Sequence, residues 1–109
     1  MEIHRLKTML DNAGIPCEFT RSSEAMGYRL FYPAETGCAC QVIQGLDTDG
    51  YDENKLEING LLTRREQESA WWLGWLTADD VFDRISKYHH SVYIPHHAGE
   101  RVSNGTDAG

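Results

Sequence analysis

Positive charge is scarce in this sequence of 109 residues, because ten Lys and Arg side chains stand against 17 Asp and Glu, for a formal net charge of −7. Binding nucleic acid without sequence preference requires clustered cationic side chains that displace counterions from phosphates. The composition therefore argues against direct nucleic-acid binding and indicates one small acidic domain. The opposite use of the charge, attraction to a basic surface, stays open.

Long hydrophobic runs are also lacking. The N-terminal segment 1–14 carries several charges and has no apolar stretch long enough for a signal peptide or a membrane span. Cysteine is rare and odd in number, with Cys17, Cys38 and Cys40, and the Cys-x-Cys spacing is too tight for an easy mutual disulfide. We therefore expect free thiols and a cytoplasmic protein that does not contact a membrane.

The pattern of apolar residues predicts an α+β fold. It comprises an N-terminal helix, an antiparallel sheet of four to five strands and a C-terminal helix, with the helices on one face of the sheet. The N-terminal helix is expected to end near residue 13, and the C-terminal helix is expected to run from about 78 to 88. The first four strands are expected near 17–20, 26–32, 38–43 and 56–62. Residues 1–97 then form a single domain, and 98–109 form a flexible tail.

Two Thr-x-x-acid sequences have the form of a helix-capping box. Thr77 to Asp80 predicts the start of the C-terminal helix, so the hydrophobic run before it precedes that helix. Thr63 to Glu66 is compatible with either one helical turn or an exposed loop.

Patterns that would indicate a metal ion are weak. Residues 47–58 match a calcium loop only at Asp47 and Asp49, and the acidic stretch only superficially resembles the Asp-x-Asp motif of haloacid-dehalogenase-type phosphatases, whose parallel core this chain lacks. The cysteines of 38–40 and the histidine pairs of 89–90 and 96–97 have the wrong spacing for zinc. We expect these histidines on the surface after the last helix, and no metal or cofactor.

Sequence signals for catalysis are also missing. The serines lack a Gly-x-Ser-x-Gly context, and there is no Gly-rich phosphate loop. We therefore predict that the protein is not an enzyme.

The segment Trp71–Leu76 contains all three tryptophans. If it is a strand, Trp71, Leu73 and Trp75 share one face and Trp72 turns to the other. Either the three indoles complete a small core, or one of them is exposed and anchors a partner, since Trp is enriched in binding hot spots.

Most of the negative charge is local. Residues 30–62 contain six acids and a single lysine, a net −5 of the total −7. Such a field can attract a basic groove by placing carboxylates where phosphates would lie, or it can simply keep a small protein in solution.

Four segments resemble small uncharacterised phage and prophage proteins of gut bacteria: IHRLKTMLDNAGIP, GYRLFYP, VIQG with YDENKLEINGLLT, and GWLTADDVFDRI. The resemblance covers most of residues 3–85, and GWLTADDVF is its most specific part. The acidic, Trp-rich half departs from that pattern. The resemblance implies no activity and no catalytic residue.

In size and charge the chain is similar to anti-defence proteins, including anti-CRISPR inhibitors. We therefore expect a non-enzymatic phage-type protein, in the cytoplasm of an infected or lysogenic bacterium, that binds and inhibits a host defence nuclease by covering its nucleic-acid-binding surface. The residues expected to contact this partner are Asp47, Asp49, Tyr51, Asp52, Glu53, Glu57 and Trp72.

Two other functions stay open. One is binding or sequestration of a nucleotide signal, in which Trp and Tyr stack on the base and Arg21, Arg29, Arg64 or Arg65 holds phosphate. The other is a structural or regulatory role in a phage.

Overall fold

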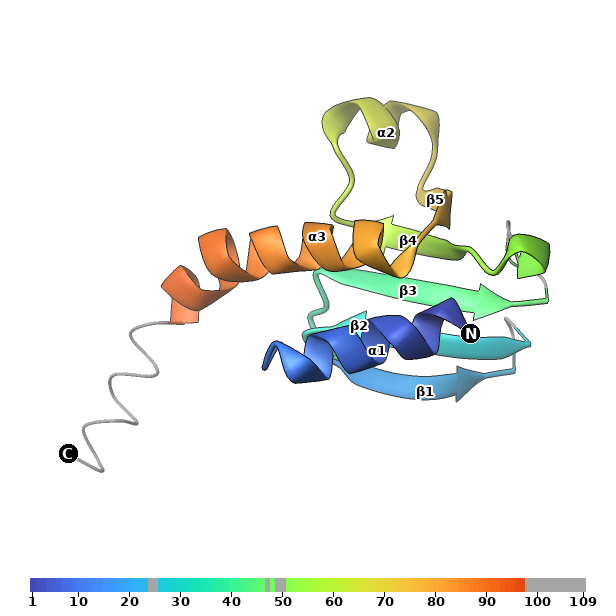
Figure 1. Cartoon of the computed structure of the whole chain (residues 1–109). Helices are drawn as coiled ribbons and strands as arrows, with labels where there is room; N and C mark the ends of the chain where they lie inside the picture. The colour runs from blue at the N-terminus through green and yellow to red at the C-terminus, as the bar shows by residue number, and fades with distance from the viewer. Residues whose placement is uncertain (24–25, 47, 49–50, 98–109) are drawn as a thin grey trace.

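The structure, a computed structural model, describes residues 1–23, 26–46, 48 and 51–97. Within these residues one antiparallel sheet has the strand order β1-β2-β3-β4-β5 (Figure 1). The strands are β1 (Glu18–Ser22), β2 (Gly27–Tyr32), β3 (Cys40–Gly45), β4 (Leu56–Gly60) and β5 (Trp72–Leu76). The helical segments are α1 (Glu2–Asn12), η1 (Tyr51–Glu53), α2 (Arg64–Ser69), α3 (Ala78–Tyr88) and η2 (His89–Tyr93). The predicted α+β fold is confirmed.

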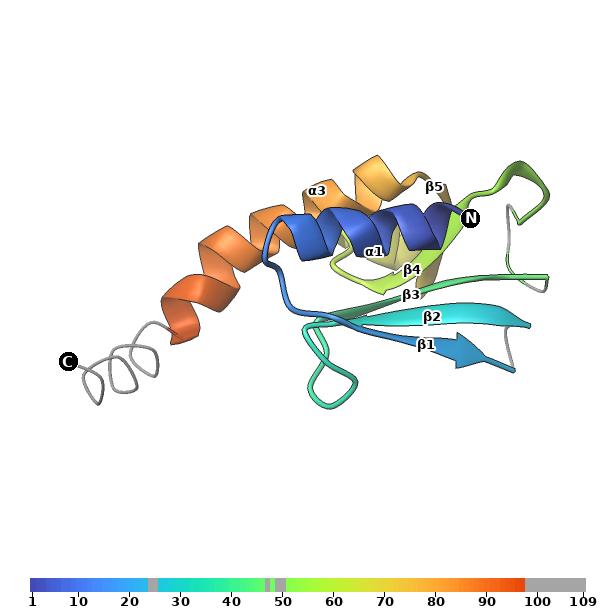
Figure 2. The ribbon, with the colours of Figure 1, turned by 60° about the horizontal axis from the view of Figure 1, so that its bottom comes forward.

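The molecule has two layers. Helices α1 and α3 lie over the same face of the sheet, as expected, whereas α2 projects from the β4–β5 side (Figures 1 and 2). In the described part of the chain, every helix is too short or too polar to cross a membrane. The opposite face of the sheet is not covered by α1 or α3 (Figure 2).

The core lies between the helices and the sheet. Both helices turn apolar residues spaced three to four apart toward it, and every second strand residue meets them. The cross-strand register places Phe19, Leu30, Val42, Ile58 and Leu73 in one row under the helices. The fully buried apolar side chains are Ile3, Leu6, Leu10, Leu30, Tyr32, Val42, Leu56, Ile58, Ala78, Val81 and Ile85.

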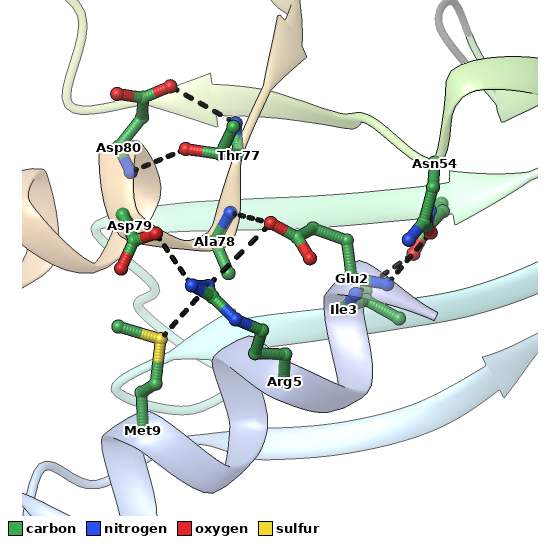
Figure 3. A network of polar contacts seen from close by, with 10 residues as sticks. Glu2, Ile3, Arg5, Met9, Asn54, Thr77, Ala78, Asp79 and Asp80 are labelled. Carbon is green, nitrogen blue, oxygen red and sulfur yellow. Dashed lines mark hydrogen bonds and ion pairs between the residues drawn. The ribbon is translucent and has the colours of Figure 1, made fainter.

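A polar network holds the start of α1 against the sheet (Figure 3). The backbone N–H of Ile3 donates to Oε1 of Gln44, and that of Glu2 donates to Oδ1 of Asn54, each over 2.9 Å. Gln44 is fully buried, and its Nε2 donates to the same Asn54 oxygen over 2.6 Å. Two N–H groups that a helix start leaves without intrahelical partners are thereby satisfied. At its other end α1 stops at Asn12, as predicted, and Gly14 follows with a φ of +71°.

The same network joins α1 to α3 (Figure 3). The Ala78 N–H donates to the Glu2 carboxylate over 2.7 Å, and Arg5 Nη2 lies 2.6 Å from Asp79 Oδ2. The expected capping box of α3 is present, because Thr77 and Asp80 exchange side-chain to backbone hydrogen bonds of 3.1 Å. The first turn of α3 is therefore held both by its own cap and by α1.

Strand β3 is central in the sheet and carries buried apolar residues. It begins at Cys40 and not at Cys38, so the predicted boundary was two residues early. Strand β4 ends at Gly60, two residues before the predicted end of this strand near 62. Gly60 has a φ of +96°, and a Cβ there would lie 2.3 Å from the Ala39 carbonyl oxygen, so a larger residue would clash with the backbone.

The C-terminal helix differs from expectation beyond residue 88. The predicted range of α3 is confirmed, but the chain continues as the π-helical η2 and stays helical through 94–97. His89 is thereby turned inward and is 7% exposed, and its Nδ1 lies 2.9 Å from Tyr32 Oη. The prediction of surface histidines is therefore wrong for His89 and right for His90 and His96, which are exposed, while His97 is half-buried.

Candidate protein-binding surface

The predicted acidic contact residues lie along the chain from η1 to β4. Asp52 and Glu53 are exposed in η1, and Glu57 is half-buried on β4. Tyr51 begins η1. Asp47 and Asp49 lie outside the described residues, as does the tail predicted at 98–109. The structure thus places three of the predicted acids at one end and along one strand of the sheet.

The tryptophans occupy the edge of the sheet. Trp71 is 85% exposed and Trp75 56% exposed, whereas Trp72 is half-buried. The prediction that all three complete the core is therefore wrong. The indole of Trp72, which was expected to contact the partner, is less accessible than its two neighbours.

A β-bulge explains why Trp75 is exposed. Leu56 pairs with Leu76 and Ile58 with Leu73, so one residue of β4, Glu57, stands opposite two of β5, Gly74 and Trp75. Both leucines of β5 therefore reach the core, and Trp75 between them does not share the face of Leu73 that strict alternation predicted. Trp75 has a φ of +63°, a left-handed conformation that costs a non-glycine residue about 1 kcal/mol.

The bulge of β5 lies opposite an acidic residue of β4. Glu57 lies between the two paired positions of β4 and therefore faces the bulged segment that carries Trp75. Two residues after Glu57 on β4, Asn59 pairs with Trp72. The Nδ2 of Asn59 donates to the Trp71 carbonyl oxygen over 3.0 Å. We call the set Asp52, Glu53, Glu57, Trp71, Trp72 and Trp75 the acidic tryptophan surface.

A hollow of about 360 Å³ adjoins Trp71. Its walls come from the end of β4, the segment after it and α2, and they include Gly60, Leu62, Gln67 and Ala70. The indole of Trp71 therefore stands beside a space that can receive a side chain of a partner. Concave sites next to exposed aromatic anchors are typical of binding hot spots.

Helix α2 forms one side of this hollow and is tied down by a part-buried ion pair. Thr63 and Glu66 form a capping box, so the helical alternative for this segment is confirmed over Arg64–Ser69. The Glu66 carboxylate accepts two hydrogen bonds from Arg84 of α3, of 2.8 and 2.7 Å. The Arg84 side-chain hydrogen bond lowers the pKa of Glu66 to about 2. Sequence reasoning missed this pair, because Arg84 reads as a surface position of an amphipathic helix.

The groups considered for metal binding or catalysis are spread apart. Among the described residues, no three His, Cys, Asp or Glu side chains gather as metal ligands would. Cys40 is buried, and desolvation raises the pKa of its thiol to about 12, whereas Cys38 lies outside the strand and is half-exposed. The buried thiol is therefore protonated at neutral pH and fills core volume as a small apolar group.

The four arginines considered for phosphate binding lie in different places. Arg21 pairs with Tyr28 on the helix-covered face of the sheet, and Arg29 pairs with Thr20 on the opposite face. Arg64 and Arg65 are exposed on α2. Comparison of the chain with protein-family models, with curated proteins and with solved structures gives no match.

Proposed function

We propose that the protein binds a basic surface of another protein through the acidic tryptophan surface and does not catalyse a reaction. The observation that carries this proposal is the position of Glu57 opposite the bulge that exposes Trp75. A carboxylate and an accessible indole thus lie on neighbouring strands at the edge of the sheet. Single exposed apolar residues are common on proteins, but two largely exposed tryptophans within five residues are not explained by packing.

Arg and Lys side chains can interact with the carboxylate and with the indole at the same time. A guanidinium pairs with carboxylates and also stacks on an indole face, and Trp is the best aromatic partner for such a cation. The exposed acids Asp52 and Glu53 extend the negative field beyond Glu57. The surface therefore favours a partner that presents several cationic side chains.

Nucleic-acid-binding proteins present cationic surfaces of this kind. Carboxylates at such a surface stand where phosphates would lie, so this chain would compete with nucleic acid for it. The resemblance to phage proteins makes a host defence nuclease, in the bacterial cytoplasm, the first class of partner to test. Inhibition of that nuclease would follow from competition, without a reaction in this chain.

The direct test measures binding to a purified candidate nuclease at several salt concentrations, with and without its nucleic-acid substrate. We expect the affinity to fall as ionic strength rises, and the nucleic acid to displace this protein. The double variant Asp52→Asn with Glu53→Gln should weaken binding about tenfold, and Trp75→Ala should weaken it by at least as much.

Matched controls separate the surface from general effects of charge and apolar area. Asp11→Asn with Asp83→Asn also removes two negative charges, from α1 and α3, and should leave the affinity nearly unchanged. Val92→Ala trims an exposed apolar residue of η2 and should likewise have little effect. Binding that is indifferent to salt, or that falls equally in both charge variants, would remove the electrostatic basis of the proposal.

A further inference from the structure

The two edges of the sheet differ in how they are built. At the β5 edge, the bulge and the left-handed backbone of Trp75 interrupt the strand. At the other edge, every residue of β1 pairs with β2 in uninterrupted register, and no described strand lies beyond β1 (Figure 1). Alternate residues of β1 therefore turn their backbone N–H and C=O groups away from the sheet.

Strand β1 lacks the features that usually keep an edge strand from pairing. Proline, lysine and bulges are the common ones, and β1 contains none of them. The side chains of Glu18, Thr20 and Arg21 are exposed. A strand added beside β1 would therefore meet a regular, accessible edge.

Charge does not oppose contact between two copies of the chain at this edge. Residues 17–32 contain two acids and two arginines and are therefore neutral, in contrast to the net −5 of residues 30–62. The exposed acids Asp52 and Glu53 lie in η1, just before β4 and away from β1. Two copies that meet at β1 thus keep their acidic regions apart.

We propose that two copies of this chain pair through their β1 strands, antiparallel and centred on Thr20, so that their sheets join into one. A two-fold axis perpendicular to the sheet keeps the helices of both copies on the same face. Thr20 then lies opposite Thr20 of the second copy, Phe19 opposite Arg21, and Glu18 opposite Ser22. No like charges stand opposite each other in this register.

The pairing gives Arg21 a second aromatic neighbour. Within one chain its guanidinium carbon lies 5.8 Å from the centre of the ring of Tyr28, its direct cross-strand partner. In the pair, Phe19 of the second copy takes the directly opposite position on the other side of Arg21, on the same helix-covered face. The guanidinium group then lies between two aromatic side chains, which favours it through cation–π attraction.

Neighbouring registers are less favourable. Centring the pair on Arg21 places two guanidinium groups directly opposite each other, which is repulsive. Centring it on Phe19 places Ser22 opposite Pro16, which lies outside β1 and has no N–H to donate. Charge and hydrogen bonding therefore both select the register centred on Thr20.

The helices leave room for the second copy. Helix α1 lies mainly over β2 and β3, so about four strand spacings of about 4.8 Å separate the α1 axes of the two copies. This distance of roughly 19 Å exceeds the helix diameter of about 10 Å. The acidic tryptophan surfaces then lie at the two far edges of the joined sheet, and the proposal does not depend on the function of that surface.

The first test measures the mass of the full chain by sedimentation equilibrium from about 10 μM to 1 mM. The average mass should rise from that of one chain to that of two, with a dissociation constant of about 0.1 mM, because two short strands bury less area than a standard interface does. Hydrogen exchange of alternate β1 amides should slow as the concentration rises, because their N–H groups become paired, whereas exchange in α2 should not change.

Charge variants locate the contact. Thr20→Lys places two lysines opposite each other, beside Arg29, the cross-strand partner of Thr20, and should weaken the pair about tenfold or more. An equal amount of Thr20→Glu should restore a mixed pair, because Lys and Glu then face each other. Ser69→Lys makes the same change of charge at the exposed end of α2 and should leave the affinity unchanged.

Thermal unfolding of dilute protein checks that Thr20→Lys is folded, and the exchange measurement needs only the unaltered chain. The mass of one chain at every concentration, or β1 exchange that does not depend on concentration, would overturn the proposal. A pair that survives Thr20→Lys, or that Ser69→Lys weakens equally, would show that the copies meet elsewhere and would also overturn it.

Discussion

Arg84 and Glu66 meet in a forked ion pair that fastens α2 to α3. Arg84 Nη1 lies 2.8 Å from Glu66 Oε1, and Nη2 lies 2.7 Å from Oε2. Arg84 Nη1 also donates to the Leu61 carbonyl oxygen over 3.0 Å, while Glu66 Oε1 accepts the Thr63 N–H over 2.8 Å. Arg84 thus anchors both Leu61, at the start of the segment that projects after β4, and helix α2. Helix α2 forms one wall of the hollow beside Trp71.

Replacing Arg84 with Met should lower the free energy of unfolding by about 1–2 kcal/mol, because the Glu66 carboxylate loses its charged partner while it remains half-buried. Urea unfolding followed by tryptophan fluorescence at pH 7 measures this loss. Lys87→Met is the control, since it breaks an exposed pair with Asp83 and should change stability by less than about 0.5 kcal/mol. Equal losses in the two variants would show that the fork adds nothing beyond surface charge.

The same pair predicts a pH dependence. The pKa of Glu66 is lowered from 4.5 to about 2 in the folded protein, so the unfolded chain takes up a proton first. The stabilisation is therefore complete above pH 4.5 and is lost as the pH falls from 4.5 toward 2. Glu66→Gln should flatten the stability profile in this interval, and urea titrations at several pH values check it. The pKa of Asp80 is also lowered, but Asp80 is present in both the unaltered protein and Glu66→Gln. If the two proteins lose stability in parallel as the pH falls, the loss does not come from Glu66.

The tryptophans should differ in their effect on stability. Trp71→Ala should change the free energy of unfolding by no more than about 0.5 kcal/mol, because the side chain is 85% exposed. Trp72→Ala should lower it by about 1–2 kcal/mol, because this half-buried indole packs at the sheet edge. Thermal or urea unfolding of the two variants tests the ranking, and a larger loss at Trp71 would mean that its indole is packed in solution.

The buried glutamine should be sensitive to an apolar replacement of similar size. Gln44→Leu leaves the Ile3 N–H without its acceptor in a buried position, which should lower the free energy of unfolding by about 1–3 kcal/mol. Gln41→Leu is the matched control on the same strand, and it should cost less because its partner Arg29 reaches solvent more easily. Stability in Gln44→Leu equal to that of the unaltered protein would show that Ile3 finds another acceptor.

Much of the fold could be predicted because its signals are local. The Thr77 to Asp80 capping box and the helical spacing after it predicted a helix over about 78–88, which is the range of α3, although the chain stays helical beyond residue 88. Alternating patterns identified the sheet with its strands, although the start of β3 was misplaced by two residues. The candidate site was predicted only in part, because its acids lie close together in the sequence whereas the exposure of its indoles depends on how β5 pairs.

The sequence by itself determined the secondary structure elements, the local acidic excess and the presence of a tryptophan-rich segment, since propensity, capping and charge are properties of neighbouring residues. Only the tertiary structure decided which of these residues are accessible and which are joined. The bulge between β4 and β5 turns Trp75 outward, the continued helix buries His89 against Tyr32, and the sheet register puts Arg29 beside Thr20. These contacts join residues that are nine or more positions apart, and no local pattern encodes them, because they depend on which strands pair and in which register.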